Sequence, residues 1–166
     1  TMLAPDMQFP VLPYKSEEGG KLLFPIGRIT GTWTYPEIRL AIKEGYKVEK
    51  VHGSIEYTAM KSPFKDYIDY LYTRRMEVKG KDELMSYTLK LAMNSTFGKF
   101  GEEGELQVIS RGKRYTMRQV PKHSNMIWAS YILAYGRINL YGHLRSMSKL
   151  GEVLYCDTDS VFVRCK

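Results

Sequence analysis

Cysteine is scarce in this sequence, and long hydrophobic runs are absent. Cys156 and Cys165 are the two cysteines among 166 residues, and no C-x-x-C pair occurs. This excludes a multi-disulfide framework and favours a reducing intracellular compartment, so we expect a cytoplasmic protein. No apolar stretch reaches the roughly 20 residues that a membrane-spanning helix needs. The N-terminal TMLAPDMQFPVLP also lacks the basic start and apolar centre of a signal peptide.

Acidic residues are outnumbered by basic ones. The 25 Lys and Arg residues against 18 Asp and Glu give a net charge of +7. This excess favours an anionic partner, with nucleic acid first. The 13 tyrosines supply rings on which bases could stack, although most such rings fill half-buried positions in strands and helices. Hydrophobic residues make up 43% of the chain, which is enough to bury a core.

The N-terminal third carries loop, strand and helix signals. Residues 1–20 are rich in Pro and Gly and are predicted to be loop, whereas residues 21–33 are predicted to form short strands. Thr34 and Glu37 have the spacing of a capping box, which predicts a helix that Gly45 ends. The predicted apolar face of this helix is Ile38, Ala41 and Ile42.

A strand or hairpin is predicted next, over residues 46–58, because β-branched residues recur there. Its candidate inward side chains are Val48, Val51 and Ile55.

Helical periodicity dominates the middle of the chain. Apolar residues at steps of three and four predict helices over residues 63–79 and 82–98, which Gly80 separates. A β-hairpin is predicted over residues 105–120 and a long helix over residues 125–147. The predicted apolar stripe of this last helix is Ile127, Tyr131, Ala134, Ile138 and Tyr141. Helices mixed with a final antiparallel strand–turn–strand indicate an α+β fold.

An acid pair interrupts the apolar stretch VLYCDTDSVFV near the C-terminus. In a strand, Asp157 and Asp159 would lie on the same face, two residues apart. Two such carboxylates repel each other, and burying a charge is costly unless it is paired. A divalent cation with a preference for carboxylate oxygen, such as Mg²⁺, would remove the conflict. The alternative is a plain hairpin turn, since Asp, Thr and Ser favour turns, and both interpretations can hold together.

A second constellation lies in the helix LKLAMNSTFGKFG. Helical spacing places Lys90, Asn94, Phe97 and Gly98 on one side. The four offer a cation for a phosphate, an amide, an aromatic ring and open space, which are the features that a nucleotide needs. The alternative is an ordinary polar surface stripe that ends at a glycine cap.

Together the two constellations resemble motifs B and C of the family B DNA polymerases. The family patterns are K-x-x-x-N-S-x-Y-G and Y-G-D-T-D-S, and this chain has K-x-x-x-N-S-x-F-G and Y-C-D-T-D-S. Cys before the first Asp is similar to the protein-primed branch found in viruses, phages and linear plasmids. The segments GTWTYPEIRLAIKEGY and FKDYIDYLYTRR also resemble family segments that precede motif B. The resemblance therefore covers nearly all of the chain.

The resemblance implies an antiparallel palm sheet with packed helices and a projecting helical hairpin, the fingers, as a partial domain of a larger polymerase. Residues 1–62 would be a palm-associated segment that follows motif A, and residues 63–100 the fingers helices with motif B. Residues 101–122 would be a short β-hairpin where protein-primed members carry an insertion that encircles DNA. Residues 123–166 would be a palm helix, with a core role for Trp128 and Tyr131, and the motif C hairpin.

The resemblance also assigns catalytic and metal-binding roles. Asp159 is similar to the palm carboxylate that binds the catalytic metals, and Asp157 to its weaker companion, while Thr158 and Ser160 shape the turn. The implied cofactor is Mg²⁺, with two ions in the full-length enzyme and Mn²⁺ as an alternative. The implied reaction is template-directed addition of a dNTP to a primer 3′-hydroxyl by two-metal phosphoryl transfer.

The resemblance also implies which residues contact the nucleotide and the DNA. Lys90 and Arg75 resemble residues that reach the incoming triphosphate, with Arg74 and Lys79 as alternatives to Arg75. The residues expected around the sugar, base and templating position are Asn94, Ser95, Phe97 and Gly98. The residues expected to contact DNA are Lys99, Arg111, Lys113 and Arg114.

The chain also departs from the family pattern. Phe97 replaces the usual Tyr, which keeps the ring that excludes a 2′-hydroxyl but loses one hydroxyl. The motif A segment, D-x-x-S-L-Y-P, with its metal-binding Asp, is absent, and Asp6 lies in a loop-like context that makes it a poor substitute. We therefore expect Thr1 to begin just after motif A and the isolated chain to be inactive.

The expected partners are a DNA template–primer, dNTPs, the remaining polymerase regions (motif A palm, exonuclease and thumb) and, in a protein-primed system, a terminal protein; no membrane is expected. The expected location is the cytoplasm of a host cell for a virus or plasmid, with an organelle as the alternative.

Two other functions stay open. The chain could be a non-catalytic nucleic-acid-binding module of polymerase descent, or one half of a split polymerase. The intact Asp157 and Asp159 favour the enzyme, since a decayed copy would have lost one of them. A metal-dependent nuclease would need more acids in strands than the sequence offers.

Overall fold

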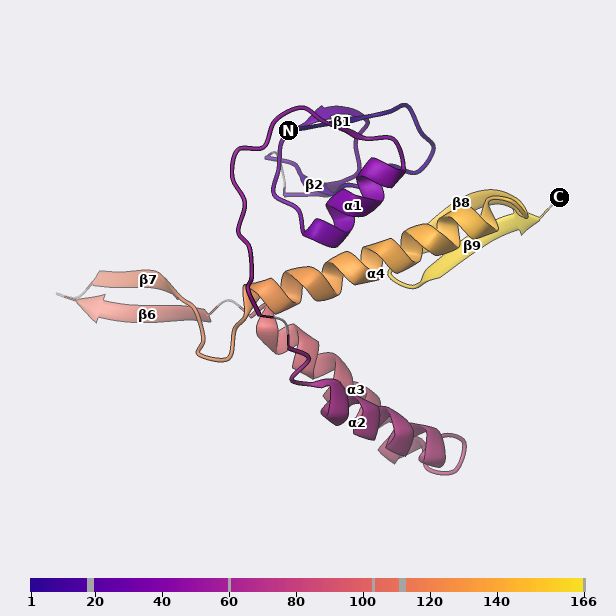
Figure 1. The fold of residues 1–166 in the computed structure, drawn as a ribbon. Helices are drawn as coiled ribbons and strands as arrows, with labels where there is room; N and C mark the ends of the chain where they lie inside the picture. Colours follow the sequence, from indigo (N-terminus) through magenta and orange to yellow (C-terminus); the bar gives the residue numbers. More distant parts are fainter. Residues whose placement is uncertain (18–19, 60, 103, 111–112, 166) are drawn as a thin grey trace. The chain divides into compact units, whose positions relative to one another are not determined.

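The structure is a computed structural model that describes residues 1–17, 20–59, 61–102, 104–110 and 113–165. Helices and short antiparallel strands are mixed along the chain, so the predicted α+β class is confirmed (Figure 1). The chain forms two compact units: residues 1–56 with 130–166, and residues 57–129. In the part of the chain that the structure describes, no helix is both long and apolar enough to cross a membrane.

A small antiparallel sheet lies at the centre of the first unit. Its central strand is β1 (Met2–Ala4), which pairs with β4 (Gly27–Ile29) on one side and β5 (Lys47–Val48) on the other. A second ladder joins β2 (Tyr14–Lys15) to β3 (Leu22–Leu23). The prediction that residues 1–20 are entirely loop is therefore wrong. Three residues are too few to show an alternating pattern, and the partners of β1 lie far along the chain.

Helix α1 (Tyr35–Lys43) begins with the predicted capping box. The Thr34 backbone N–H and hydroxyl both donate to Glu37 Oε2, at 3.2 and 2.8 Å. The helix ends before Gly45, whose φ of +94° favours glycine. The predicted apolar face is partly wrong, because Ala41 is buried but Ile42 is 51% exposed. The second buried position in the helix is Glu37, a charged residue.

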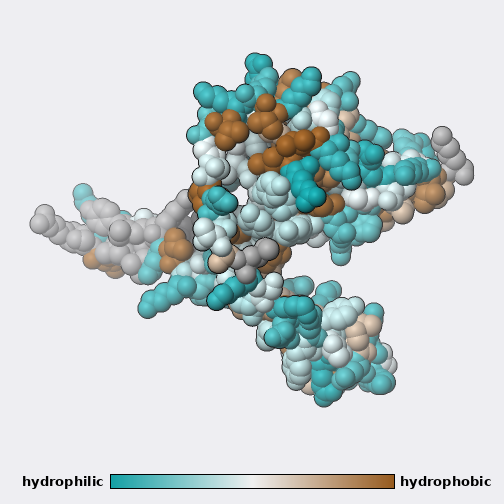
Figure 2. Space-filling view, in the orientation of Figure 1, coloured by the Kyte–Doolittle hydropathy of each residue, from teal (hydrophilic) through white to brown (hydrophobic). Residues whose placement is uncertain are grey.

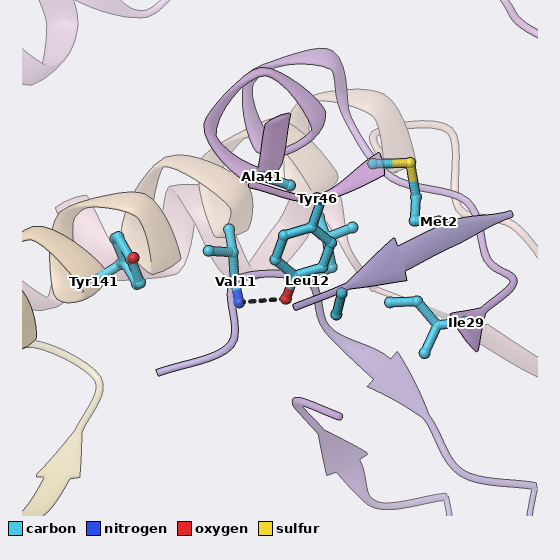
Figure 3. Close-up of a cluster of buried hydrophobic side chains, with 8 residues drawn as sticks. Met2, Val11, Leu12, Ile29, Ala41, Tyr46 and Tyr141 are labelled. Atoms are coloured by element: carbon cyan, nitrogen blue, oxygen red, sulfur yellow. Dashed lines mark hydrogen bonds between the residues drawn. The ribbon is translucent and has the colours of Figure 1, made fainter. Parts of the chain in front are cut away.

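The core of the first unit lies around Leu12, which is fully buried (Figure 3). The Tyr46 hydroxyl accepts a hydrogen bond from the Val11 backbone N–H at 2.9 Å, so a buried polar group of the N-terminal segment has a partner. Other buried members of the cluster are Met2, Ala4, Ile29, Ala41 and Tyr141.

Helix α4 (Met126–Met147) contributes Tyr141 to this core, as its predicted stripe requires. Ala134 is also buried, whereas Ile127 at the start of the stripe is exposed. Two ion pairs join α4 to α1 and its C-cap. Arg137 contacts Glu37 at 2.8 Å, and Arg145 contacts Glu44 at 2.6 Å.

The Glu37 carboxylate thus caps α1 and also neutralises Arg137. Its side chain is 3% exposed, and that of Arg137 is 25% exposed. Because removal of one partner leaves the other charge poorly solvated, we expect Glu37→Ala to lower the free energy of unfolding by about 3 kcal/mol. Glu37→Gln keeps a capping group and should cost less. Urea unfolding followed by circular dichroism measures both.

The control for this prediction is Arg28→Ala. Arg28 pairs with Glu49 at 2.7 Å on an exposed surface, where ion pairs contribute little. An unfolding midpoint that shifts as far for Arg28→Ala as for Glu37→Ala would contradict the assignment.

The segment after α1 differs from its prediction. The ladder ends at β5, and the predicted inward residues Val51 and Ile55 are 71% and 81% exposed. Val48 is exposed as well. β-branched residues favour a strand only where they can pack against a neighbouring strand. Among the described residues, this segment has no partner strand after β5.

The second unit contains an antiparallel pair of helices, α2 (Lys65–Val78) and α3 (Glu83–Phe100) (Figure 1). Gly80, with a φ of +79°, lies in the turn between them, as predicted. Asp82 caps α3 by accepting a hydrogen bond from Met85 N at 2.9 Å. The helix continues two residues beyond the predicted end at Gly98.

Three aromatic rings pack at the base of this pair. The centroids of Phe64, Phe100 and Trp128 are 5.0 to 5.4 Å apart. Trp128 lies in the first turn of α4, where Asn125 Oδ1 accepts its backbone N–H at 3.1 Å. Trp128 contacts rings of the helical pair, but it is 38% exposed, so the predicted core role is not borne out for this residue.

Two hairpins complete the fold. One joins β6 (Gly104–Ser110) to β7 (Lys113–Gln119), where a hairpin was predicted. The other joins β8 (Gly151–Asp157) to β9 (Ser160–Cys165). Its apolar residues Leu154 and Phe162 are exposed, and Figure 2 shows hydrophobic side chains at the surface of this hairpin and of the N-terminal part. The apolar stretch around the acid pair is therefore not buried in this chain.

Candidate functional site

The acid pair lies at the tip of the β8–β9 hairpin. Asp157 pairs with Ser160 as the last rung of the ladder, and Thr158 and Asp159 form a two-residue connection. Both carboxylates are exposed. The predicted placement of both acids on one face of a strand is wrong, because the strand ends at Asp157. Asp157 ends β8, and Asp159 lies two residues later in the turn.

The two acids differ in their hydrogen bonds. The Thr158 hydroxyl donates to Asp157 Oδ1 at 3.0 Å, and the Ser160 hydroxyl donates to the Asp157 backbone carbonyl, also at 3.0 Å. Among the residues that the structure describes, none donates a hydrogen bond to the Asp159 carboxylate. Asp157 is therefore held by its neighbours, and both oxygens of Asp159 can accept an external ligand. Sequence reasoning predicted that the hydroxyls shape the turn but missed the contact with the carboxylate.

The donor chemistry of this turn fits a hard cation in part. Carboxylate oxygens are the ligands that Mg²⁺ prefers. Within the described ranges, no group of three or more His, Cys, Asp and Glu side chains is placed to hold a metal ion. Asp6, exposed in the loop after β1, does not add a third ligand. The turn alone thus offers two carboxylates to a metal.

Helix α3 presents the predicted nucleotide stripe. Lys90, Asn94 and Gly98 are exposed along it, and Phe97 is half-buried. Apart from the nearby backbone of its own helix, no atom of the described residues lies within 4 Å of a Cβ placed on Gly98, so this position is open. Lys90 has no acidic partner within the described part of the chain, which leaves its charge available for an anion. The Ser95 hydroxyl donates to the Ala92 carbonyl at 3.0 Å and is turned back to its own helix.

The three basic residues considered for the triphosphate, on α2 and just after it, have different environments. Arg74 pairs with Glu77 at 2.6 Å on the exposed side, and this hydrogen bond raises the pKa of Arg74. Arg75 is half-buried and lies one turn beyond the buried Leu71. Its Nε atom is buried without a hydrogen-bond partner among the described residues. Lys79, just past the helix, is exposed. The i, i+4 spacing from Leu71 was the sequence signal that distinguishes Arg75 from Arg74.

The residues considered for DNA contact differ in their availability. Lys113 and Arg114 are exposed near the end of the β6–β7 hairpin, where they pair with Ser110 and Ile109. Arg111 lies outside the described residues.

Lys99 is less available, because it contacts Glu102 at 2.8 Å. His123 Nε2 contacts the same carboxylate at 2.6 Å. The hydrogen bonds from Lys99 and then from His123 lower the pKa of Glu102. This cluster lies where the chain leaves α3, and sequence reasoning did not identify it.

Most of the chain matches a known protein family. The family described as DNA polymerase type B, organellar and viral, matches residues 2–127, which include the whole of α3. The chain therefore belongs to the organellar and viral type B DNA polymerases. The resemblance drawn from the two sequence motifs is confirmed at the level of the family. The acid turn lies beyond the matched residues.

Individual relatives carry matching names. A probable DNA polymerase of Neurospora intermedia is 28% identical over 93% of this chain and 19% of its own length. A probable DNA polymerase of Ascobolus immersus is 32% identical over 59% of this chain and 8% of its own length. The DNA polymerase of Acidianus bottle-shaped virus is 35% identical over 45% of this chain and 9% of its own length. The chain thus spans about a fifth or less of these relatives. No solved structure matches it.

Proposed function

We propose that this chain provides the nucleotide-binding helix and two metal ligands of a DNA-directed DNA polymerase. The observation that carries the proposal is the α3 stripe, where Lys90 has no acidic partner in the described chain and Gly98 faces open space. The full enzyme would add dNTPs to a primer 3′-hydroxyl under the direction of a template. The organellar and viral family supports this reaction class.

Each residue of the stripe has a role in this proposal. Lys90 and Arg75 neutralise negative charge on the incoming triphosphate, including the charge that develops during transfer. The Phe97 ring packs against the deoxyribose, and Gly98 leaves room for the nucleotide. Asn94 offers an exposed amide to the sugar or base. The Ser95 hydroxyl donates a hydrogen bond within α3, so Ser95 contributes to the shape of the helix and its hydroxyl does not contact the nucleotide.

The acid turn supplies the metal ligands of the proposal. Asp159, with a free carboxylate, is the principal ligand, and Asp157 is its companion. When bound, Mg²⁺ or Mn²⁺ supplies activation of the primer hydroxyl and stabilisation of the leaving pyrophosphate. Because the turn provides two carboxylates, the complete site needs a further acid, which family B polymerases carry in motif A.

The rest of the chain is assigned by the same proposal. Residues 63–100 act as fingers that close on the correct nucleotide, and residues 1–62 and 123–166 belong to the palm. In the β6–β7 hairpin, within residues 101–122, Lys113 and Arg114 contact DNA phosphates without reading sequence. The partners are the template–primer, dNTPs and the remaining palm, exonuclease and thumb regions. Protein priming, with a terminal protein as partner, belongs to the proposal as well.

The 166-residue chain alone tests the role of the missing acid. We expect it to incorporate no dNTP into a primed template with Mg²⁺ or Mn²⁺, and to bind Mn²⁺ only weakly, because two exposed carboxylates do not complete a two-metal site. Primer extension on a denaturing gel is the measurement, with an intact family B polymerase as the positive control. Clear incorporation by the chain alone would contradict the need for a further ligand.

A second candidate, a non-catalytic nucleic-acid-binding module or one half of a split polymerase, is favoured by the lack of a third metal-ligating side chain beside the two acids among the described residues. Sequencing the DNA upstream of the Thr1 codon separates the candidates. A reading frame that encodes D-x-x-S-L-Y-P before Thr1 supports the enzyme. A start codon at that place supports the module or the split polymerase.

A further inference from the structure

Residues 51–56 carry a strand pattern but have no partner strand among the described residues. Apolar or small residues alternate with polar ones over V-H-G-S-I-E, which is the pattern of a strand with one covered face. The segment forms no helix or turn, and Val51 and Ile55 are 71% and 81% exposed. It therefore presents an uncovered apolar face and a row of backbone groups that a further strand could pair with.

The pairing between β1 and β5 extends to the first residue of the chain. The Thr1 carbonyl accepts the backbone N–H groups of both Glu49 and Lys50, at 3.1 and 3.3 Å. Two residues opposite one form a β-bulge, after which regular pairing can resume. The Thr1 nitrogen donates to the Lys50 carbonyl at 2.6 Å, so Thr1 and Lys50 exchange both hydrogen bonds of an antiparallel pair. In a longer protein this nitrogen belongs to a peptide group and can donate the same bond.

The same register assigns the side chains to the two faces of the sheet. The Thr1 hydroxyl contacts His52 Nε2 at 3.1 Å, so these two polar side chains share one face. Met2, the next residue of β1, points to the other face, where it is 3% exposed in the core of the first unit. In a regular strand Val51 and Ile55 alternate with His52 and so belong to the Met2 face. The uncovered apolar side chains thus continue the core face of the sheet.

We propose that the residues directly before Thr1 in a longer protein continue β1 and pair antiparallel with residues 51–56. The occupant follows from position, because β1 already runs antiparallel to this part of the chain and Thr1 forms the last pair. The chain spans about a fifth or less of its polymerase relatives, which leaves a long stretch of sequence from which such a strand can come. The inference is independent of the proposed function, because it needs chain before Thr1 and no reaction.

The continued register predicts which groups gain partners. Counting back from the pair of Thr1 with Lys50, every second preceding residue forms a hydrogen-bonded pair. The residues that gain a partner for their N–H groups are His52, Ser54 and Glu56. The N–H groups between them face away from the new strand. The first, third and fifth residues before Thr1 lie on the core face, so we expect them to be apolar.

Hydrogen exchange followed by NMR tests this pairing. The 166-residue chain is compared with the same chain extended by about ten of its natural upstream residues, the length of a long strand. In the extended chain the amides of His52, Ser54 and Glu56 should exchange at least about tenfold more slowly, while the amides between them change little. The Val11 amide, which donates to the Tyr46 hydroxyl in the core, should be equally protected in both and reports that the unit is folded.

Two proline variants of the extended chain form a matched pair. Ser54→Pro removes an N–H group that the new strand would bind, so the amides of His52 and Glu56 should return towards their rates in the 166-residue chain. Gly53→Pro removes an N–H group that faces away. Apart from its chain neighbours, no described atom lies within 4 Å of a Cβ at Gly53, so the protection should persist.

Several results would overturn the inference. One is equal exchange of the His52, Ser54 and Glu56 amides in the two chains while Val11 stays protected. Polar residues at the first, third and fifth upstream positions, or a reading frame without residues before Thr1, would do the same. Protection in the 166-residue chain that rises with protein concentration would assign the strand to a second copy instead. Loss of the polymerase proposal in primer extension would leave this pairing in place, because exchange rates do not depend on activity.

Discussion

Asp159→Asn should lower the rate of primer extension by about 1000-fold or more in a polymerase that carries this sequence with a complete palm. The Asp159 carboxylate is exposed at the tip of the hairpin and accepts no hydrogen bond from the described residues, so its charge is available to a metal ion. An amide of the same shape keeps the size of the side chain but cannot balance the charge of the cation. Single-turnover incorporation of one dNTP measures the effect.

Asp157→Asn and Glu152→Gln are the matched controls for this prediction. Asp157 accepts a hydrogen bond from the Thr158 hydroxyl and is proposed as the companion ligand, so its loss should reduce the rate less than the loss of Asp159. Glu152 lies on the same hairpin, where it pairs with Arg164, and its neutralisation should leave the rate nearly unchanged. A normal rate for Asp159→Asn would remove the turn from the active site.

Lys90→Ala should lower kcat/KM for the dNTP by about 100-fold in the same polymerase, with a large share of the loss in KM. Lys90 lies on the exposed stripe of α3 without an acidic partner in the described chain. Its ammonium group is free to meet a triphosphate, and alanine leaves that charge unbalanced. Steady-state incorporation at varied dNTP concentration measures the change.

The controls for Lys90 come from α2. Arg74 is already paired with Glu77, so Arg74→Ala should change kcat/KM by less than about threefold, as expected for an exposed ion pair. Arg75 has no anionic partner among the described residues, so Arg75→Ala should resemble Lys90→Ala in direction. Normal kinetics for Lys90→Ala together with impaired Arg74→Ala would show that a different cation meets the triphosphate.

Local chemistry made several elements predictable from the sequence. Thr34 and Glu37 have capping-box spacing and form that box, because the interaction needs only four consecutive residues. Gly80 separates the two helices of the second unit for a similarly local reason. The stripe from Lys90 to Gly98 followed from helical geometry alone. The position of these side chains relative to the acid turn stays a prediction.

Other features depend on distant parts of the chain and were missed. The strand that begins at Met2 exists because it pairs with Ile29 and Val48, and a three-residue segment gives no signal of such partners. Ile55 is exposed because no strand of the described residues lies beside it, although its residue type favours one. The difference between Asp157 and Asp159 depends on the direction of one hydroxyl, which no spacing rule reveals.

The contact between Glu37 and Arg137 has a consequence for biosynthesis. The two residues are 100 positions apart, and the first unit is built from both ends of the chain. At a translation rate of about 5–20 residues per second, the carboxylate emerges roughly 5–20 s before the guanidinium that neutralises it. During that interval the Glu37 carboxylate lacks its Arg137 partner, so the core of the N-terminal segment does not close. Ribosome-bound chains that stop before α4 should therefore remain open to proteases over residues 1–56.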